Sequence, residues 1–146
     1  MTALPQAVLF CCDHNAVRSP MAEGLMKRLH GHDVYVQSAG VQNDLEIDGF
    51  AIAVCAELGV ELSRHRSRSF EEMRDLGDDL EQFDLIVALS DASHRQARDL
   101  ARHAHIDVER WDVADPTAVG RTRDEKLVAY REVRDEIDGR LRGRFP

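Results

Sequence analysis

The 146-residue sequence lacks a long apolar segment and is poor in cysteine. No apolar run approaches the roughly 18 residues that cross a bilayer, so a membrane-spanning protein is not expected. The first six residues also lack the basic and apolar regions of a signal peptide. The three cysteines are an odd set, and Cys11 and Cys12 are adjacent and poorly placed to bridge each other. We therefore expect a cytoplasmic protein in a reducing compartment, without structural disulfides.

Basic residues are outnumbered as well. The 19 Lys and Arg face 27 Asp and Glu, and the resulting net charge of -8 repels nucleic acid and anionic lipid. Neither nucleic acid nor a membrane is therefore an expected partner, and any anion site must be a local feature. His103 and His105 share no helical face and lack neighbours at metal-ligand spacing, so no metal site is expected.

The apolar residues that are present suffice for one packed domain. They make up 43% of the chain, which is enough to fill a core, and the length is typical of one domain of roughly 100–200 residues. No repeat, low-complexity tract or Pro-rich linker divides the sequence. We expect a single domain over residues 1–146, and the sequence leaves open whether it is a monomer or a weak dimer.

Short apolar runs alternate with helical patterns along the chain. Such alternation is typical of right-handed βαβ crossovers, which build a parallel sheet covered by helices on both faces. The predicted fold class is therefore α/β, with three layers and about four parallel strands. The expected strands are 7–12, 34–36, 83–89 and 108–113, and the expected helices are 19–31, 50–58, 91–103 and 122–141.

The loop after the first expected strand carries a thiol and a guanidinium. Ligands bind at the carboxyl ends of strands in open parallel sheets, and the loop from Cys12 to Ser19 lies there. Backbone N–H groups above a helix N-terminus form an anion nest, to which Arg18 can add a bidentate fork. The same positive field favours the thiolate form of Cys12. The sequence thus predicts a phosphate-binding loop after strand 1, shaped for a tetrahedral oxyanion.

These residues resemble a known family signature. Val8-Leu9-Phe10, Cys12, Asn15 and the segment from Arg18 to Glu23 are similar to the motif of the low-molecular-weight protein tyrosine phosphatases and the related thioredoxin-type arsenate reductases. The resemblance extends over nearly the whole chain, and its further segments are Ser38-Ala39-Gly40, His65-Arg66-Ser67-Arg68, Phe83-Asp84-Leu85-Ile86 and Asp115-Pro116.

The resemblance implies a role for each matching residue. It implies that Cys12 is the nucleophile, Arg18 binds phosphate and Asp115 is the general acid. It also implies that Asn15 and Ser19 shape the loop. As loop residues, the following are predicted to bind the substrate: Asp13, His14, Asn15, Ala16, Val17 and Ser19. Ser38 and His65 are implied to support this loop.

The activity so implied is that of a cysteine-dependent phosphatase. It would hydrolyse phosphomonoesters, by default protein phosphotyrosine, through a cysteinyl-phosphate intermediate and without metal or cofactor. The expected partner is a phosphorylated protein or a small phosphate ester.

The sequence departs from the family at the substrate site. His14 stands where most members have glycine, and a side chain at that position is expected to crowd the loop, although histidine tolerates positive φ better than most residues do. Asp13 places a carboxylate beside the nucleophile, and we expect it to point outward into solvent. No aromatic residue follows Asp115-Pro116, so stacking on a phosphotyrosine ring is missing from that loop. Phosphoarginine and small phosphate esters therefore stay open as substrates.

Two other functions stay open. An arsenate reductase of this type needs thiols to resolve its arseno-cysteine adduct, yet residues 89–92 contain no cysteine. Cys55 has the spacing of a core residue, and Cys11 should point away from Cys12, so this reading requires an external thiol. In the other reading, His14 disables turnover and leaves a phospho-ligand binding protein.

Overall fold

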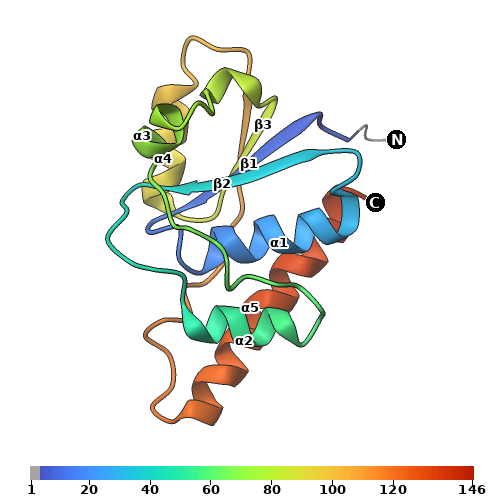
Figure 1. The fold of residues 1–146 in the computed structure, drawn as a ribbon, viewed down its shortest axis with the longest axis vertical. Helices are drawn as coiled ribbons and strands as arrows, with labels where there is room; N and C mark the ends of the chain where they lie inside the picture. The colour runs from blue at the N-terminus through green and yellow to red at the C-terminus, as the bar shows by residue number, and fades with distance from the viewer. Residues whose placement is uncertain (1–3) are drawn as a thin grey trace.

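The computed structural model describes residues 4–146. Residues 1–3, which belong to the segment that lacks signal-peptide features, lie outside the described residues. The fold is the predicted α/β class, with one sheet of four parallel strands in the order β2-β1-β3-β4 (Figure 1). The strands are β1 (Ala7–Cys12), β2 (Tyr35–Gly40), β3 (Leu85–Ala88) and β4 (Asp107–Arg110).

Helices cover both faces of the sheet, as predicted (Figure 1). On one face lie α1 (Arg18–His30), α2 (Gly49–Ala56) and α5 (Arg123–Arg144), and α1 packs directly on β1 and β2. The other face carries α3 (Phe70–Asp75) and α4 (Asp91–Leu100), with the short 3-10 helix η1 (Leu80–Gln82) between them in sequence. In residues 4–146, no helix has the length and apolarity needed to cross a membrane.

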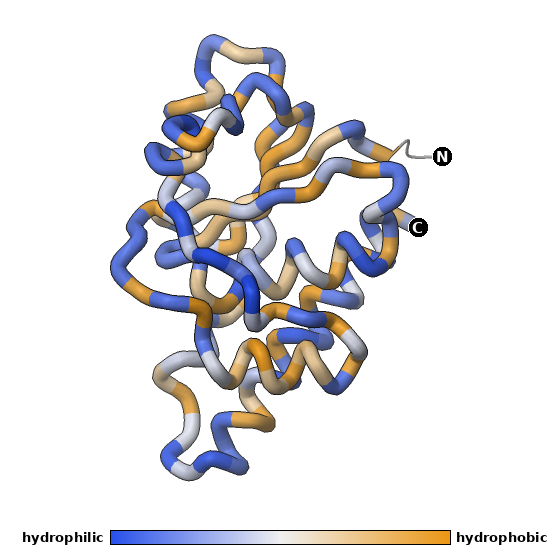
Figure 2. Tube along the Cα trace, viewed as in Figure 1, coloured by the Kyte–Doolittle hydropathy of each residue, from blue (hydrophilic) through white to orange (hydrophobic). Residues whose placement is uncertain are grey.

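The central strand β1 is buried along its whole length because helices cover it from both sides. Figure 2 shows β1 and β3 as largely hydrophobic, whereas the later part of the connection from α2 to α3, which precedes α3, is hydrophilic. Alternate side chains of β1 enter two separate cores. Phe10 and Cys12 join the core beneath α1 and α5, and Leu9 and Cys11 join the one beneath α4. The two adjacent cysteines therefore point to opposite faces, as predicted.

Several element ends differ from the prediction. The first helix begins at Arg18, and the side chain of Ser19 bonds to Cys12 instead of capping the helix. α2 ends at Ala56, short of Gly59, α4 ends at Leu100 and β4 ends at Arg110. Backbone hydrogen bonds define such ends, and hydrophobic period alone places them only to within a few residues.

One α-helix was not expected. Ser69 and Glu72 form a capping box in which each side chain accepts from the other residue's backbone N–H, and α3 starts there. The helix has six residues, too short to show a helical period, so only its cap marks it in the sequence. By contrast, Thr122 caps the 22-residue α5 through the N–H of Glu125, as the sequence spacing predicts.

Candidate active site

The loop between β1 and α1 is held from the side by the chain that follows β2. The N–H groups of Val41 and Asp48 donate to the carbonyls of Cys12 and Ala16, at 3.1 and 3.0 Å. Gly40, at the end of β2, lies so close that a Cβ there would stand 2.7 Å from the backbone nitrogen of Asn15. A side chain at position 40 would therefore displace the loop.

Asn15 fixes the shape of this loop. Its φ is 54°, and it is the one non-glycine residue with positive φ in the described chain. Both the nitrogen and the oxygen of its buried side-chain amide form hydrogen bonds. Nδ2 donates to the hydroxyls of Ser19 and Ser38 at 2.8 and 2.9 Å. Its Oδ1 accepts from the backbone N–H of Arg68 and from Nε2 of His65, both at 3.0 Å. These bonds offset the cost of a left-handed conformation, which asparagine tolerates better than most residues.

The same network reaches the thiol. Ser19 Oγ lies 3.0 Å from the sulfur of Cys12, which is only 3% exposed. Because Asn15 already donates to that oxygen, the Ser19 hydroxyl hydrogen is free to donate to the sulfur. A hydrogen bond to sulfur stabilises the thiolate over the thiol.

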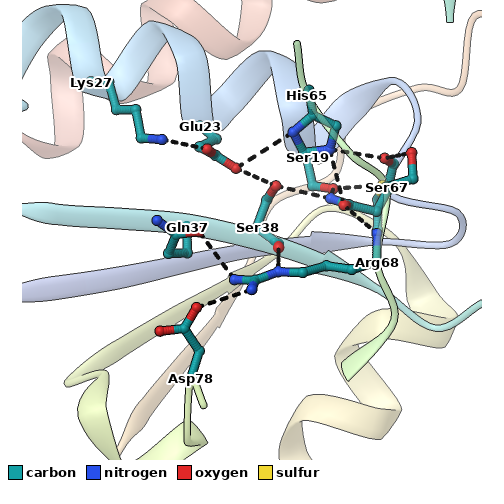
Figure 3. Close-up of polar contacts among 11 residues, drawn as sticks. Ser19, Glu23, Lys27, Gln37, Ser38, His65, Ser67, Arg68 and Asp78 are labelled. Atoms are coloured by element: carbon teal, nitrogen blue, oxygen red, sulfur yellow. Dashed lines mark hydrogen bonds and ion pairs between the residues drawn. The ribbon is translucent and has the colours of Figure 1, made fainter. Parts of the chain in front are cut away.

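At the edge of the network, between Lys27 and His65, lies the carboxylate of Glu23 (Figure 3). Glu23 accepts from Ser38 at 2.5 Å and from Lys27 at 2.6 Å, and one of its oxygens lies 3.9 Å from Nδ1 of His65. Burial lowers the pKa of His65, although the charge of Glu23 opposes this effect. The imidazole is therefore favoured in its uncharged form, with the Nε2 hydrogen directed at Asn15.

Arg68 joins the network to the sheet, a role that the sequence reading did not assign. Its guanidinium donates to the carbonyl of Ser38, to Asp78 and to Gln37 at 3.0 to 3.1 Å (Figure 3). Glu23 was likewise noticed only as part of the signature. The spacing of these residues gives no sign that they meet, because the contacts join α1, β2 and the segment before α3.

Arg18 spans the loop from its buried side to its open side. The side chain of this residue is largely buried, and its Nη1 donates to the carbonyls of Leu89 and Val113 at 2.9 and 3.1 Å. Its Nη2 faces outward, 3.4 Å from Oδ2 of Asp13 and 3.9 Å from Oδ2 of Asp115. One end of the guanidinium is thus anchored and the other is available to an anion.

A cavity of about 230 Å³ opens above the loop. The sequence-predicted residues divide between this cavity and the network beneath it, where Asn15, Ser19, Ser38 and His65 lie. Among the described residues, no Phe, Tyr or Trp lines the cavity, in agreement with the missing aromatic wall. The lining residues are Cys12, Asp13, His14, Ala16, Val17, Arg18, Leu45, Glu46, Asp48, Asp115 and Thr117.

The structure corrects the expectations for Asp13 and His14, the two loop residues that depart from the family. Asp13 does not simply point outward: its carboxylate faces Arg18, and its Oδ1 is buried without a hydrogen-bond partner. His14 does not adopt positive φ, and Nδ1 of its imidazole lies 2.6 Å from Asp44 at the rim. The side chain therefore leaves the loop toward the segment after β2, where it does not crowd the centre.

Asp115, on the loop before α5, also lines the opening. Its Oδ1 accepts from the N–H of Thr117 at 3.0 Å, and 46% of its side chain is exposed. α5, which follows this loop, is tied to the other wall because the Tyr130 hydroxyl donates to Asp48 at 3.0 Å. Burial and, to a smaller extent, this bond raise the pKa of Tyr130, so its hydroxyl stays protonated.

The remaining cysteines are buried elsewhere. Burial strongly raises the pKa of Cys11, which faces the core beneath α4. Burial also raises the pKa of Cys55, on α2, to about 12. Both thiols are therefore held in the protonated, unreactive form. Within residues 4–146, no three His, Cys, Asp or Glu side chains gather as a metal ion would require.

Comparisons with known proteins agree with this geometry. The arsenate reductase of Bacillus subtilis (strain 168) is 32% identical over 136 residues, which cover 92% of this chain and 91% of that protein. A solved structure described as an arsenate reductase in the phosphate binding state matches with a TM-score of 0.76 and 25% identity, covering 94% and 95% of the two chains.

A solved phosphatase matches to a similar degree. The low molecular weight protein tyrosine phosphatase from T. tengcongensis has a TM-score of 0.71 and 27% identity, covering 91% of this chain and 92% of that one. Residues 7–145 match the family described as low molecular weight phosphotyrosine protein phosphatase. The chain therefore belongs to this family of cysteine-dependent enzymes, which unites phosphatases and arsenate reductases of one fold.

Proposed function

We propose that the protein hydrolyses phosphomonoesters through a cysteinyl-phosphate intermediate. The observation that carries this proposal is the convergence of three groups on one cavity: the sulfur of Cys12, the outward nitrogen of Arg18 and the carboxyl of Asp115. A nucleophile, an oxyanion binder and an acid are the parts that phosphoryl transfer through cysteine requires.

In the first step, the thiolate of Cys12 attacks phosphorus in line with the leaving oxygen. The S–P bond forms while the P–O bond breaks, and Asp115 gives its proton to the departing oxygen. Arg18 Nη2 and the loop amides stabilise the charge on the three equatorial oxygens. The Ser19 hydroxyl is placed to donate a hydrogen bond to the attacking sulfur.

In the second step, a water molecule replaces the sulfur at phosphorus. Asp115, now a carboxylate, takes a proton from this water as the P–O bond forms and the S–P bond breaks. Inorganic phosphate leaves, and both Cys12 and Asp115 return to their starting states. One carboxyl group thus serves both steps.

The substrate class is broader than phosphotyrosine alone. Protein phosphotyrosine is the family's default, but the cavity offers Leu45 and Thr117 where an aromatic wall would stack on a phenyl ring. A phosphorylated protein in the cytoplasm and a small phosphate ester both suit an opening of this size.

Arsenate reduction is the second candidate. The names of the curated relatives favour it, since proteins 28–32% identical to this chain over about nine-tenths of its length are called arsenate reductases. Reduction of arsenate to arsenite needs two electrons from thiols. Cys11 and Cys55 are buried with raised pKa values, so an external thiol would have to supply these electrons.

The test compares both reactions in one preparation. We expect the wild type to release nitrophenol from para-nitrophenyl phosphate and the Cys12→Ser variant to release none. We expect no Cys12-dependent arsenite formation from arsenate with glutathione or with a thioredoxin system. Sustained arsenite release without phosphatase activity would favour the reductase. Tight vanadate binding without hydrolysis would indicate a phospho-ligand binding protein. Hydrolysis by Cys12→Ser at the wild-type rate would refute the assignment of Cys12 as the nucleophile.

A further inference from the structure

A carboxylate stands at the oxyanion end of the site. Oδ2 of Asp13 lies 3.4 Å from Nη2 of Arg18, and Oδ1 of Asp13 is buried without a donor. Exposure of the Asp13 side chain is 39%, so the rest of the group reaches the cavity that it lines. A negative acceptor is thus placed where the ligand is itself negative.

The nitrogen beside Asp13 is the one that an incoming anion must use. Nη1 of Arg18 is occupied by the carbonyls of Leu89 and Val113. Nη2 is the end that faces the cavity, and Asp13 and Asp115 flank it. An oxyanion bound to Nη2 therefore brings one of its oxygens next to the carboxylate of Asp13.

The protonation of that ligand oxygen decides the sign of the contact. An unprotonated oxygen and a carboxylate are both acceptors and both negative, so they repel each other. A hydroxyl oxygen instead donates to the carboxylate, and such charge-assisted bonds are the strong ones. The carboxylate of Asp13 therefore repels a ligand that lacks a hydroxyl and accepts a hydrogen bond from a ligand that has one.

We propose that Asp13 is a specificity-determining residue that selects tetrahedral oxyanions carrying a proton. Hydrogen phosphate, hydrogen arsenate and the monoanion of a phosphomonoester carry such a proton, and sulfate does not. The inference rests on the proposed binding of a tetrahedral oxyanion at this loop, which hydrolysis and arsenate reduction share.

Asp13 and Asp115 act on different atoms in this scheme. In the proposed hydrolysis Asp115 exchanges a proton with the leaving oxygen and then with water. Asp13 accepts a hydrogen bond from another phosphoryl oxygen and keeps its own charge throughout. Loss of Asp13 therefore changes which anions bind, while the acid and the nucleophile stay in place.

Phosphate and sulfate form a matched pair of probes. At about pH 8 both are dianions of nearly the same shape, and only hydrogen phosphate has a hydroxyl to donate. We expect calorimetric titration to show that the wild type binds phosphate at least about tenfold more tightly than sulfate, since a hydrogen bond to a charged group contributes about that much. In Asp13→Asn and in Asp13→Ala, sulfate should bind within about threefold of phosphate.

The Asp44→Asn variant is the matched control. It removes one negative charge from the same rim, but Asp44 contacts His14 and not Arg18, so the preference for phosphate should persist. Equal affinity of the wild type for both anions, or an unchanged ratio in both Asp13 variants, would overturn the inference. Absence of any anion binding would overturn it together with the proposed function. Selective phosphate binding without hydrolysis would refute the hydrolysis alone.

Discussion

The inner side of the phosphate loop and its outer rim are built differently. On the inner side the Asn15 amide makes four hydrogen bonds, and Ser19 and Ser38 are almost fully buried. On the rim, Asp115 is nearly half exposed, and one oxygen of Asp13 has no partner.

This difference suggests two separate roles: the inner side holds the loop in shape, and the rim selects the ligand. A fully bonded buried network has one low-energy arrangement, because any change leaves a polar group unpaired. Partly exposed groups with few contacts can change at little cost to stability. The residues of the inner side match the family signature, whereas on the rim Asp115 matches it and His14 and Asp13 depart from it. Substitutions on the two sides should therefore have different effects.

Arg18 belongs to both sides, so its replacement should have the largest effect. In Arg18→Lys a single ammonium cannot both bond the carbonyls of Leu89 and Val113 and present a fork to the substrate. We expect kcat/KM for para-nitrophenyl phosphate to fall by about 10³-fold. Steady-state kinetics measure this, with the exposed Arg121→Lys as control. A fall of less than about tenfold would show that Arg18 does not bind the phosphoryl group.

Asp115→Asn should break the rim chemistry without disturbing the inner network. We expect kcat to fall by about 10²-fold or more for an alkyl phosphate, whose leaving oxygen needs a proton. The loss should be smaller for para-nitrophenyl phosphate, a better leaving group, and vanadate should bind as tightly as before. Kinetics with both substrates and vanadate inhibition test this. Equal losses for the two substrates would contradict a general-acid role.

Asn15 tests the inner side. Asn15→Ala removes four hydrogen bonds and puts alanine at φ 54°, so unfolding free energy should fall by about 2–4 kcal/mol. Asn15→Gly loses the same bonds but tolerates the backbone conformation, and it should be about 1 kcal/mol more stable than the alanine variant. Urea unfolding of both variants provides the measurement. A glycine variant no more stable than alanine would mean that the left-handed backbone costs nothing.

His65 makes the inner side sensitive to pH. Burial holds the pKa of His65 below its ordinary value of 6.5, so the unfolded chain binds more protons at mildly acidic pH. The contribution is fully present above pH 6.5 and is lost as the pH falls toward the lowered folded pKa. Urea unfolding between about pH 8 and pH 5 should show this decline. His65→Gln can still donate to Asn15 without titrating, and an equally steep decline in it would exclude His65 as the cause.

His14→Ala should have the smallest effect. The bond from His14 to Asp44 joins two partly exposed side chains, and such pairs contribute about 0–1 kcal/mol. We expect the unfolding free energy and kcat for para-nitrophenyl phosphate to change little. His14→Gly should behave in the same way, because the residue does not use positive φ. A large gain of activity in the glycine variant would instead show that the histidine impairs turnover.

Most of the fold follows from local pattern, whereas the contacts of the site do not. Buried strands such as 7–12 and amphipathic helices such as α5 can be predicted from the spacing of their apolar residues. The six-residue α3 has no period to show, and only the pair Ser69 and Glu72 marks it. Tertiary hydrogen bonds decide where α1 begins, since Ser19 bonds to Cys12 rather than to the helix end.

The resemblance located residues of the site but not all their partners. It placed Cys12 and Arg18 on the loop, and the structure brings Asp115 from about a hundred residues away to the same cavity. Glu23 and Arg68 were recognised only as parts of matching segments and were given no role, because their importance comes from long-range contacts. The orientation of Asp13 was missed for a similar reason: an exposed carboxylate is the usual case, and only the position of Arg18 Nη2 makes the inward direction favourable.

Gly40 shows how a residue without chemistry can limit variation. Its missing side chain is the space into which the backbone of Asn15 fits, so even alanine would push on the residue that organises the network. A random mutagenesis screen scored by activity would rank this position beside the nucleophile. The screen would thereby report the close packing of β2 against the loop. A map of the enzyme based on activity alone would count Gly40 as a catalytic residue, although its role is structural.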